Sequence, residues 1–73
     1  MYAIYYYNNL NKKIYFEQFV QANDELIEEI KFIYTEKKEE ATKFITRLNA
    51  LQFIQDYFAI TGHNMRIENI KEV

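Results

Sequence analysis

A stripe of apolar residues, spaced three and four positions apart, runs through residues 37–60 and stops just before the only glycine of the chain. This spacing gathers the apolar side chains on one face of a helix, and that face must be buried against another layer. Thr35 is the expected N-cap, and Gly62 suits the left-handed residue that ends a helix. We therefore predict one long helix over 37–60, with Leu48 buried at the centre of its apolar face.

The first half of the chain has the pattern of β-strands. Residues 1–7 and 13–20 are rich in aromatic and β-branched residues, and a polar run with turn chemistry separates them. The segment 27–35 is also predicted to be a strand, although a helix over the same apolar residues is the alternative. A five-residue loop over 21–25 would close this second hairpin. The imperfect alternation of residues 64–73 predicts a closing strand.

These elements predict a single α+β domain spanning residues 1–73. A small three-stranded antiparallel meander would carry one long helix packed on it, and a C-terminal strand would join the sheet, in the order β-β-β-α-β. The alternative is a β-hairpin followed by two helices. A chain of this length buries only about 60% of the surface that it exposes when unfolded, so its stability depends on a rich core or on association.

The register of the first hairpin decides which residues face the helix. A four-residue loop over 8–11 pairs Tyr5 with Ile14 and Ala3 with Phe16. Because residues opposite each other share a face of the sheet, we expect these four residues to face the helix together. A slip of one residue would exchange the faces of the first strand. With the four-residue loop, the sheet face away from the helix gathers an unusually aromatic and apolar set: Tyr2, Ile4, Tyr6, Tyr15, Phe19, Ile27 and Ile33.

Residue types that perform catalysis are scarce in this chain. It has no Cys and no Ser, and its one histidine, His63, follows the helix-ending glycine. Nucleophilic triads and thiolate metal sites are therefore not expected. A single glycine also argues against a glycine-rich phosphate loop. We expect no enzyme, no cofactor and no metal site.

The charge of the chain is small but uneven. The formal net charge is −2, yet residues 24–40 carry seven acids and three lysines. The chain lacks the basic stripe on which nucleic-acid binding usually depends, so nucleic acid is an unlikely partner. The acidic segment includes Glu36, Glu39 and Glu40, which could meet a basic groove of a partner protein by imitating phosphates. A solvated acidic loop and helix start is the simpler interpretation.

The sequence predicts a soluble, cytoplasmic protein. It shows no signal-peptide pattern, and no run approaches the ~20 apolar residues that span a bilayer. The residues Ile, Lys, Asn, Tyr and Phe, all with AT-rich codons, make up 37 of 73 positions. This bias fits a gene of a low-GC bacterium, its phage or a mobile element, in which case the protein would act in the host cytosol.

These features predict a non-enzymatic protein–protein interaction module. The specific hypothesis is a small phage or mobile-element accessory protein that binds and inhibits a host protein of defence or nucleic-acid processing. Tyrosine is enriched at interfaces because it combines apolar area with a polar tip. The alternatives are single-stranded nucleic-acid binding by the sheet-face aromatics and a structural homodimer. The predicted partner-binding residues are Tyr2, Tyr6, Tyr15, Phe19, Glu36, Glu39 and Glu40.

Overall fold

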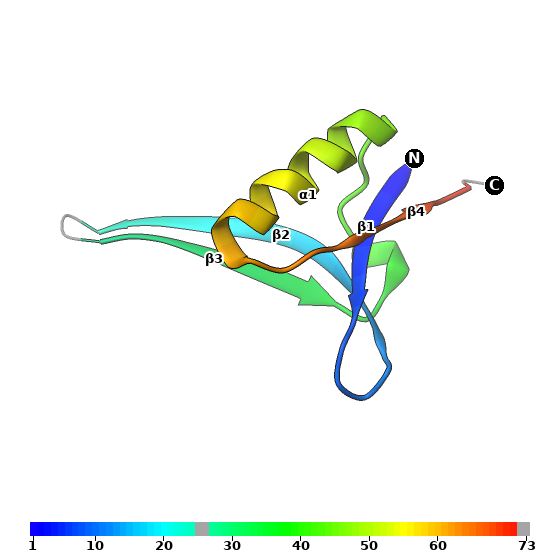
Figure 1. Cartoon of the computed structure of the whole chain (residues 1–73), viewed down its shortest axis with the longest axis horizontal. Coiled ribbons are helices and arrows are strands. Elements are labelled where there is room, and N and C mark those ends of the chain that lie inside the picture. The colour runs from blue at the N-terminus through cyan, green and yellow to red at the C-terminus, as the bar shows by residue number, and fades with distance from the viewer. Residues whose placement is uncertain (25–26, 72–73) are drawn as a thin grey trace.

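The computed structural model describes residues 1–24 and 27–71, and in this part of the chain four antiparallel strands form one sheet beside one α-helix. The predicted α+β class and the element order β-β-β-α-β are confirmed. The strands are β1 (Tyr2–Tyr7), β2 (Lys13–Asp24), β3 (Ile27–Thr35) and β4 (Arg66–Asn69), and the helix is α1 (Arg47–Thr61). The sheet order is β3-β2-β1-β4, so the N-terminal strand lies inside the sheet (Figure 1).

The helix is shorter than the apolar stripe predicted. Its N-cap is Thr46, whose hydroxyl oxygen accepts a hydrogen bond from the Asn49 amide at 3.1 Å, so the predicted start near residue 37 is wrong. Gly62 ends the helix in the left-handed conformation, as predicted, with φ at 75°. In place of the first predicted turns, the chain forms a short 3-10 turn, η1 (Lys38–Glu40), followed by an extended segment.

This extended segment lies between β1 and β2, where the two strands separate. The Thr42 amide donates to the Phe16 carbonyl of β2 at 3.1 Å, and the Thr42 hydroxyl donates to the carbonyl of Glu17. Two residues later, Phe44 pairs with Tyr2 of β1 through backbone hydrogen bonds of 2.7 and 2.8 Å. The backbone groups of residues 42–44 are thus used to bridge the strands, which explains why they do not begin the helix.

The first hairpin differs from the prediction by one residue. Tyr7 pairs with Lys13 and Tyr5 pairs with Tyr15, so the connection spans residues 8–12. Asn11 takes a positive φ of 58°, and the Asn8 side chain accepts hydrogen bonds from two loop amides, which together accommodate the fifth residue. The slip exchanges the faces of β1, and Tyr5 consequently faces away from the helix.

A register shift between Phe16 and Gln18 alters the second strand. Glu17 is the extra residue, so Phe16 and Phe19 lie on the same side of the sheet although they are three positions apart. Residues 21–24, predicted as a loop, instead extend β2, while residues 25 and 26 lie outside the described residues. The predicted five-residue loop over 21–25, which would pair Val20 with Leu26, is wrong, because Val20 pairs with Lys31.

The long β2–β3 hairpin projects beyond the rest of the molecule (Figure 1). We call residues 18–24 and 27–33 the arm, and we call β1, β4, residues 13–17 and α1 the body. The radius of gyration is 13.0 Å, compared with about 11 Å for a compact chain of this length. The closing strand β4 is shorter than the predicted 64–73, and residues 72 and 73 lie outside the described residues.

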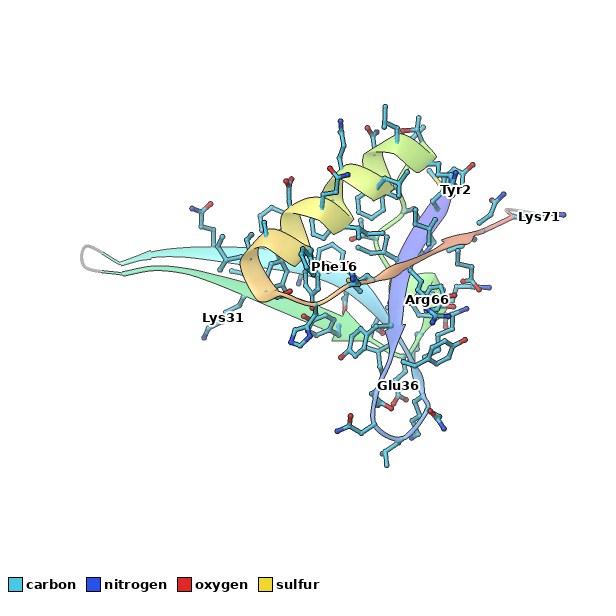
Figure 2. All side chains as sticks on the ribbon, in the orientation of Figure 1. Tyr2, Phe16, Lys31, Glu36, Arg66 and Lys71 are labelled. Atoms are coloured by element: carbon cyan, nitrogen blue, oxygen red, sulfur yellow. The ribbon has the colours of Figure 1, made fainter. Side chains whose placement is uncertain are left out.

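The main core lies between the sheet and the helix. Ile4 and Phe16 from the sheet meet Ala50 and Tyr57 from the helix, with Met65 beside them. Figure 2 shows Phe16 beneath the helix. Leu48, predicted to be buried at the centre of the helix, is 63% exposed, because the helix turns Ala50 and Tyr57 to the sheet instead.

A smaller cluster packs on the opposite sheet face. Ala3, Tyr15 and Ile70 meet Ala41, which comes from the segment after η1. The segment that was predicted to be the start of the helix therefore covers the back of the sheet.

Candidate functional site: an apolar groove beside the helix

A groove of about 290 Å³ opens where the arm separates from the helix. We call it the helix–arm groove. The sheet supplies Phe19 from β2 and residues of β3, and the C-terminal half of α1 supplies the other wall. Its lining residues are Phe19, Ile30, Phe32, Phe53, Asp56, Tyr57 and Ile60. The helix packs most closely on β1 and β4, so the arm strands are left partly uncovered.

Large apolar side chains remain open to solvent at this groove. Phe19 is 54% exposed, Ile30 is 40% exposed and Ile60 is 56% exposed. Single exposed apolar residues are common on protein surfaces, but these three line one concave site from three different elements. Each costs roughly 25 cal/mol per Å² of apolar area left in water. The groove thus holds the contact area that a binding partner could bury.

Phe53 organises the floor of the groove. The centroid of its ring lies 4.5 Å from the ring centroid of Phe16, 5.6 Å from that of Phe44 and 6.3 Å from that of Phe19. A neighbouring hollow of about 240 Å³, which shares Phe19 and Phe53, continues the apolar surface toward Phe44. Aromatic contacts at these distances fix the rings relative to one another, so the groove has a defined shape before any partner binds.

The polar groups of the groove are few. Asp56 is the one charged residue among the described residues that line it. The Tyr57 hydroxyl is hydrogen-bonded to the Tyr34 hydroxyl at 2.7 Å. Burial and this hydrogen bond raise the pKa of Tyr34 above its ordinary value of 10.0, so this phenol remains neutral at physiological pH. The groove therefore offers apolar area with one negative charge.

The predicted aromatic face is not formed as expected. Tyr2 and Tyr6 pack against the main core on the helix side, because the register slip reverses β1, and their predicted place on the open face is wrong. Phe19, also predicted on that face, lies on the helix side because of the bulge at Glu17. Of the predicted aromatic partner-binding residues, Phe19 is the one that lines the groove.

Tyr15 does occupy the face away from the helix, but it is only 5% exposed. Its hydroxyl donates to Glu68 at 2.8 Å, and the Lys13 ammonium lies 2.6 Å from the same carboxylate. Burial raises the pKa of Glu68, but the hydrogen bonds from Lys13 and Tyr15 outweigh that effect and hold it below the ordinary value. These residues form a structural ion-pair cluster, and Tyr15 presents little surface to a partner.

The three predicted acidic residues are exposed and follow the end of β3. Glu36 lies 3.9 Å from Lys12, and Glu40 accepts a hydrogen bond from the Thr35 hydroxyl at 3.0 Å. Glu39 is exposed beside them in η1. None of the three lines the helix–arm groove, although they extend the acidic charge of the strand that borders it. Their role in partner binding stays a prediction.

Sequence reasoning missed most of the groove. It assigned Ile30 to the buried core and gave no role to Ile60, which lies off the apolar stripe of the helix. The relative lengths of the hairpin and the helix are the one feature that indicates the groove. A strand rises more than twice as far per residue as a helix. A hairpin with strands of twelve and nine residues must therefore extend beyond the cover of a fifteen-residue helix that crosses it.

A second hollow, of about 410 Å³, lies at the opposite side of Tyr57 and is lined by tyrosines together with His63, Asn64 and Met65. Its tyrosines are Tyr6, Tyr7, Tyr34 and Tyr57. Tyr6 and Tyr34 meet edge to face at 5.6 Å between ring centroids. The exposed His63 has no acidic residue beside it in this lining, so the arrangement lacks the partner that would orient an imidazole for proton transfer.

The described residues contain neither a cluster of metal ligands nor a helix that could cross a membrane. No group of three or more His, Asp or Glu side chains among them is placed to hold a metal ion. Within residues 1–24 and 27–71, the helix is too short and too polar to cross a membrane. In comparisons with known proteins, the chain matches no protein-family model, no curated protein and no solved structure.

Proposed function

We propose that this protein is a non-enzymatic protein-binding module whose binding surface is the helix–arm groove. The observation that carries this proposal is the joint exposure of Phe19, Ile30 and Ile60 around one concave apolar site. Interfaces are typically centred on apolar and aromatic anchors of this kind, in pockets that exclude water on binding. The volume of the groove is close to the lower end of the range of ligand pockets, so it suits a few side chains of a partner.

The specific hypothesis that the partner is a host protein, inhibited by a phage or mobile-element product, stays a prediction from composition. The alternative of single-stranded nucleic-acid binding loses its expected surface, because Tyr2 and Tyr6 face the helix and Tyr15 is buried. Lys13, whose ammonium group is beside Tyr15, is paired with Glu68 and is therefore not free to meet a phosphate. The groove itself carries a negative charge at Asp56, which disfavours a polyanion.

Selection of random displayed peptides on the folded protein tests this function without knowledge of the natural partner. Peptides that bind the groove are expected to lose about tenfold in affinity for the Ile60→Gln variant. The matched control is Leu48→Gln, which changes an equally exposed apolar residue elsewhere on the same helix and should alter binding by less than about twofold. The proposal fails if no peptide is enriched, or if the two variants weaken binding equally.

A further inference from the structure

The groove is bordered by a free sheet edge. In the sheet order β3-β2-β1-β4, β3 has a neighbour on one side only. It is nine residues long, whereas β4, the other edge, has four residues. Every second residue of an edge strand directs its backbone N–H and C=O away from the sheet, where another strand can pair with them. Within the described part of the chain, the outer side of β3 pairs with no other strand.

This edge lacks two of the usual devices that prevent pairing, a proline and a bulge. The chain contains no proline, and the bulge of the hairpin lies in β2 at Glu17 instead of in β3. The one lysine of the strand, Lys31, points away from the helix (Figure 2). Over residues 30–35, the side chains that β3 directs toward the helix are Ile30, Phe32 and Tyr34, which are apolar or aromatic. A strand added along residues 30–35 would therefore meet no inward-pointing charge from β3.

The groove and the edge can be used by one extended segment. Ile30 and Phe32 belong to β3 and also line the groove, opposite Tyr57 and Ile60 of the helix. Neighbouring strands lie about 4.8 Å apart, and every second side chain of an added strand points to the helix side. Apolar side chains at alternate positions would thus enter the groove while the backbone pairs with β3, which is the geometry of strand addition.

The net negative charge around β3 favours one kind of binding segment over another. Residues 24–40, which include β3, carry seven acids and three lysines, and Asp56 adds a negative charge to the groove. A second copy that paired its own β3 with this edge would bring two net-negative strands together, which is unfavourable. A positively charged segment is instead attracted to both the edge and the exposed Glu36 beyond it.

We propose that β3 accepts an extended segment of a partner protein as a fifth strand. The segment carries apolar residues at alternate positions, which enter the helix–arm groove, and it has a net positive charge. This inference rests on the proposed function, because it names the mode and the chemistry of binding at the same groove.

The probe for this proposal is a short capped peptide in which valines alternate with threonines and a lysine stands at each end. Titration of the full chain, followed by backbone amide shifts, should place binding at Lys31 and Ile33 of β3 and at Ile60. Replacing both lysines of the peptide by glutamates should weaken binding at least about tenfold. The Ile60→Gln variant should weaken it similarly, and Leu48→Gln should not.

N-methylation of the peptide separates strand addition from simple apolar contact. Alternate backbone N–H groups of a strand point to opposite edges. Methylation of the valine amides and methylation of the threonine amides should therefore have opposite outcomes: one set abolishes binding, and the other leaves the affinity within about threefold of the parent peptide. If both methylated peptides bind like the parent, strand addition is overturned while the groove stands as a binding surface.

Two further outcomes would also overturn this proposal. In the first, the alternating peptide fails to bind while displayed peptides bind the groove, which preserves the proposed function but not the extended, basic occupant. In the second, sedimentation shows that the protein alone is a dimer that Ile60→Gln dissociates, which makes a second copy the occupant. Failure of the whole display selection, by contrast, would count against the proposed function itself.

Discussion

In the body, Phe16 lies between the sheet and helix α1 and is 2% exposed, whereas in the arm Phe19, on the same strand and the same face, is 54% exposed. The two residues have the same side chain and differ only in how far neighbouring elements bury it. The body strands are covered by the helix on one face and by Ala41 and its neighbours on the other. The arm is a two-stranded ribbon, and such ribbons are marginally stable in water without a covering layer. The contrast implies that the body provides stability and that the arm provides surface.

The largest effect should follow from a cavity in the body. Ile4 is fully buried, so Ile4→Ala is expected to cost about 2–5 kcal/mol, a large part of the total stability of a small domain. Leu48→Ala, a truncation of similar size at a residue 63% exposed, should cost less than about 0.5 kcal/mol. Urea unfolding of both variants measures the difference. Equal losses would show that the helix packs with another face.

Hydrogen exchange compares the two regions directly. The backbone amides of β1 and β4 should exchange at least about 100-fold more slowly than those of residues 18–21 and 30–33, because the arm can open without unfolding the core. Exchange followed by NMR at neutral pH measures this ratio. Equal protection in both regions would mean that the arm and body unfold as one unit, and the division between them would be lost.

The ion-pair cluster on the back of the body should give a smaller, pH-dependent effect. The pKa of Glu68 is held below its ordinary value of 4.5, so its contribution to stability is present above that pH and is lost as the pH falls through the lower, folded-state pKa. Glu68→Gln should cost about 1 kcal/mol at pH 7 and less at pH 3. Glu36→Gln, at an exposed ion pair 3.9 Å long, is the control and should have little effect at either pH. A pH-independent loss in Glu68→Gln would contradict this account.

The smallest effect is expected at the junction between the helix and the arm. Tyr34→Phe removes the hydrogen bond to Tyr57 and should cost about 0.5–1 kcal/mol at pH 7. The pKa of Tyr34 is raised by burial and by that hydrogen bond, so the stability that it contributes is present below pH 10.0 and is lost as the pH rises above it. The variant should therefore lose stability less steeply than the parent between about pH 10 and 12. Urea unfolding at several pH values measures this dependence. If the free energy of unfolding falls equally steeply with pH in the variant and the parent, the structure does not shift the pKa of Tyr34.

Local patterns in the sequence were sufficient for the class and the order of elements. The alternation in residues 27–35 and the single glycine after the helix led to correct assignments of β3 and of the end of α1. The start of the helix could not be predicted in the same way. Both Thr35 and Thr46 are good N-caps, and the choice between them depends on whether residues 42–44 bridge β1 and β2, which is a tertiary contact.

The faces of the sheet depended on single residues. One additional loop residue, with Asn11 in the left-handed region, reversed the predicted orientation of Tyr2, Tyr5 and Tyr6. One bulged residue, Glu17, did the same for Phe19. Because side chains alternate with a period of two, each such residue changes the face of one strand relative to its partner, and apolar pattern alone does not reveal it. Of the residues predicted to bind a partner, Phe19 is the one that lines the groove, and its role in binding stays a prediction.

The pairing of Tyr2 with Asn69 has a consequence for the order in which the molecule assembles. The hairpin of β2 and β3 joins neighbouring parts of the chain and can close as soon as both are available. The pairing of β1 with β4 must wait until the helix and the last strand have followed, and contacts between distant residues form slowly. The β2–β3 hairpin, which contains the exposed arm, thus forms first, and the pairing of β1 with β4 in the body forms last. A newly made chain would present the free edge of β3 before it has a completed core.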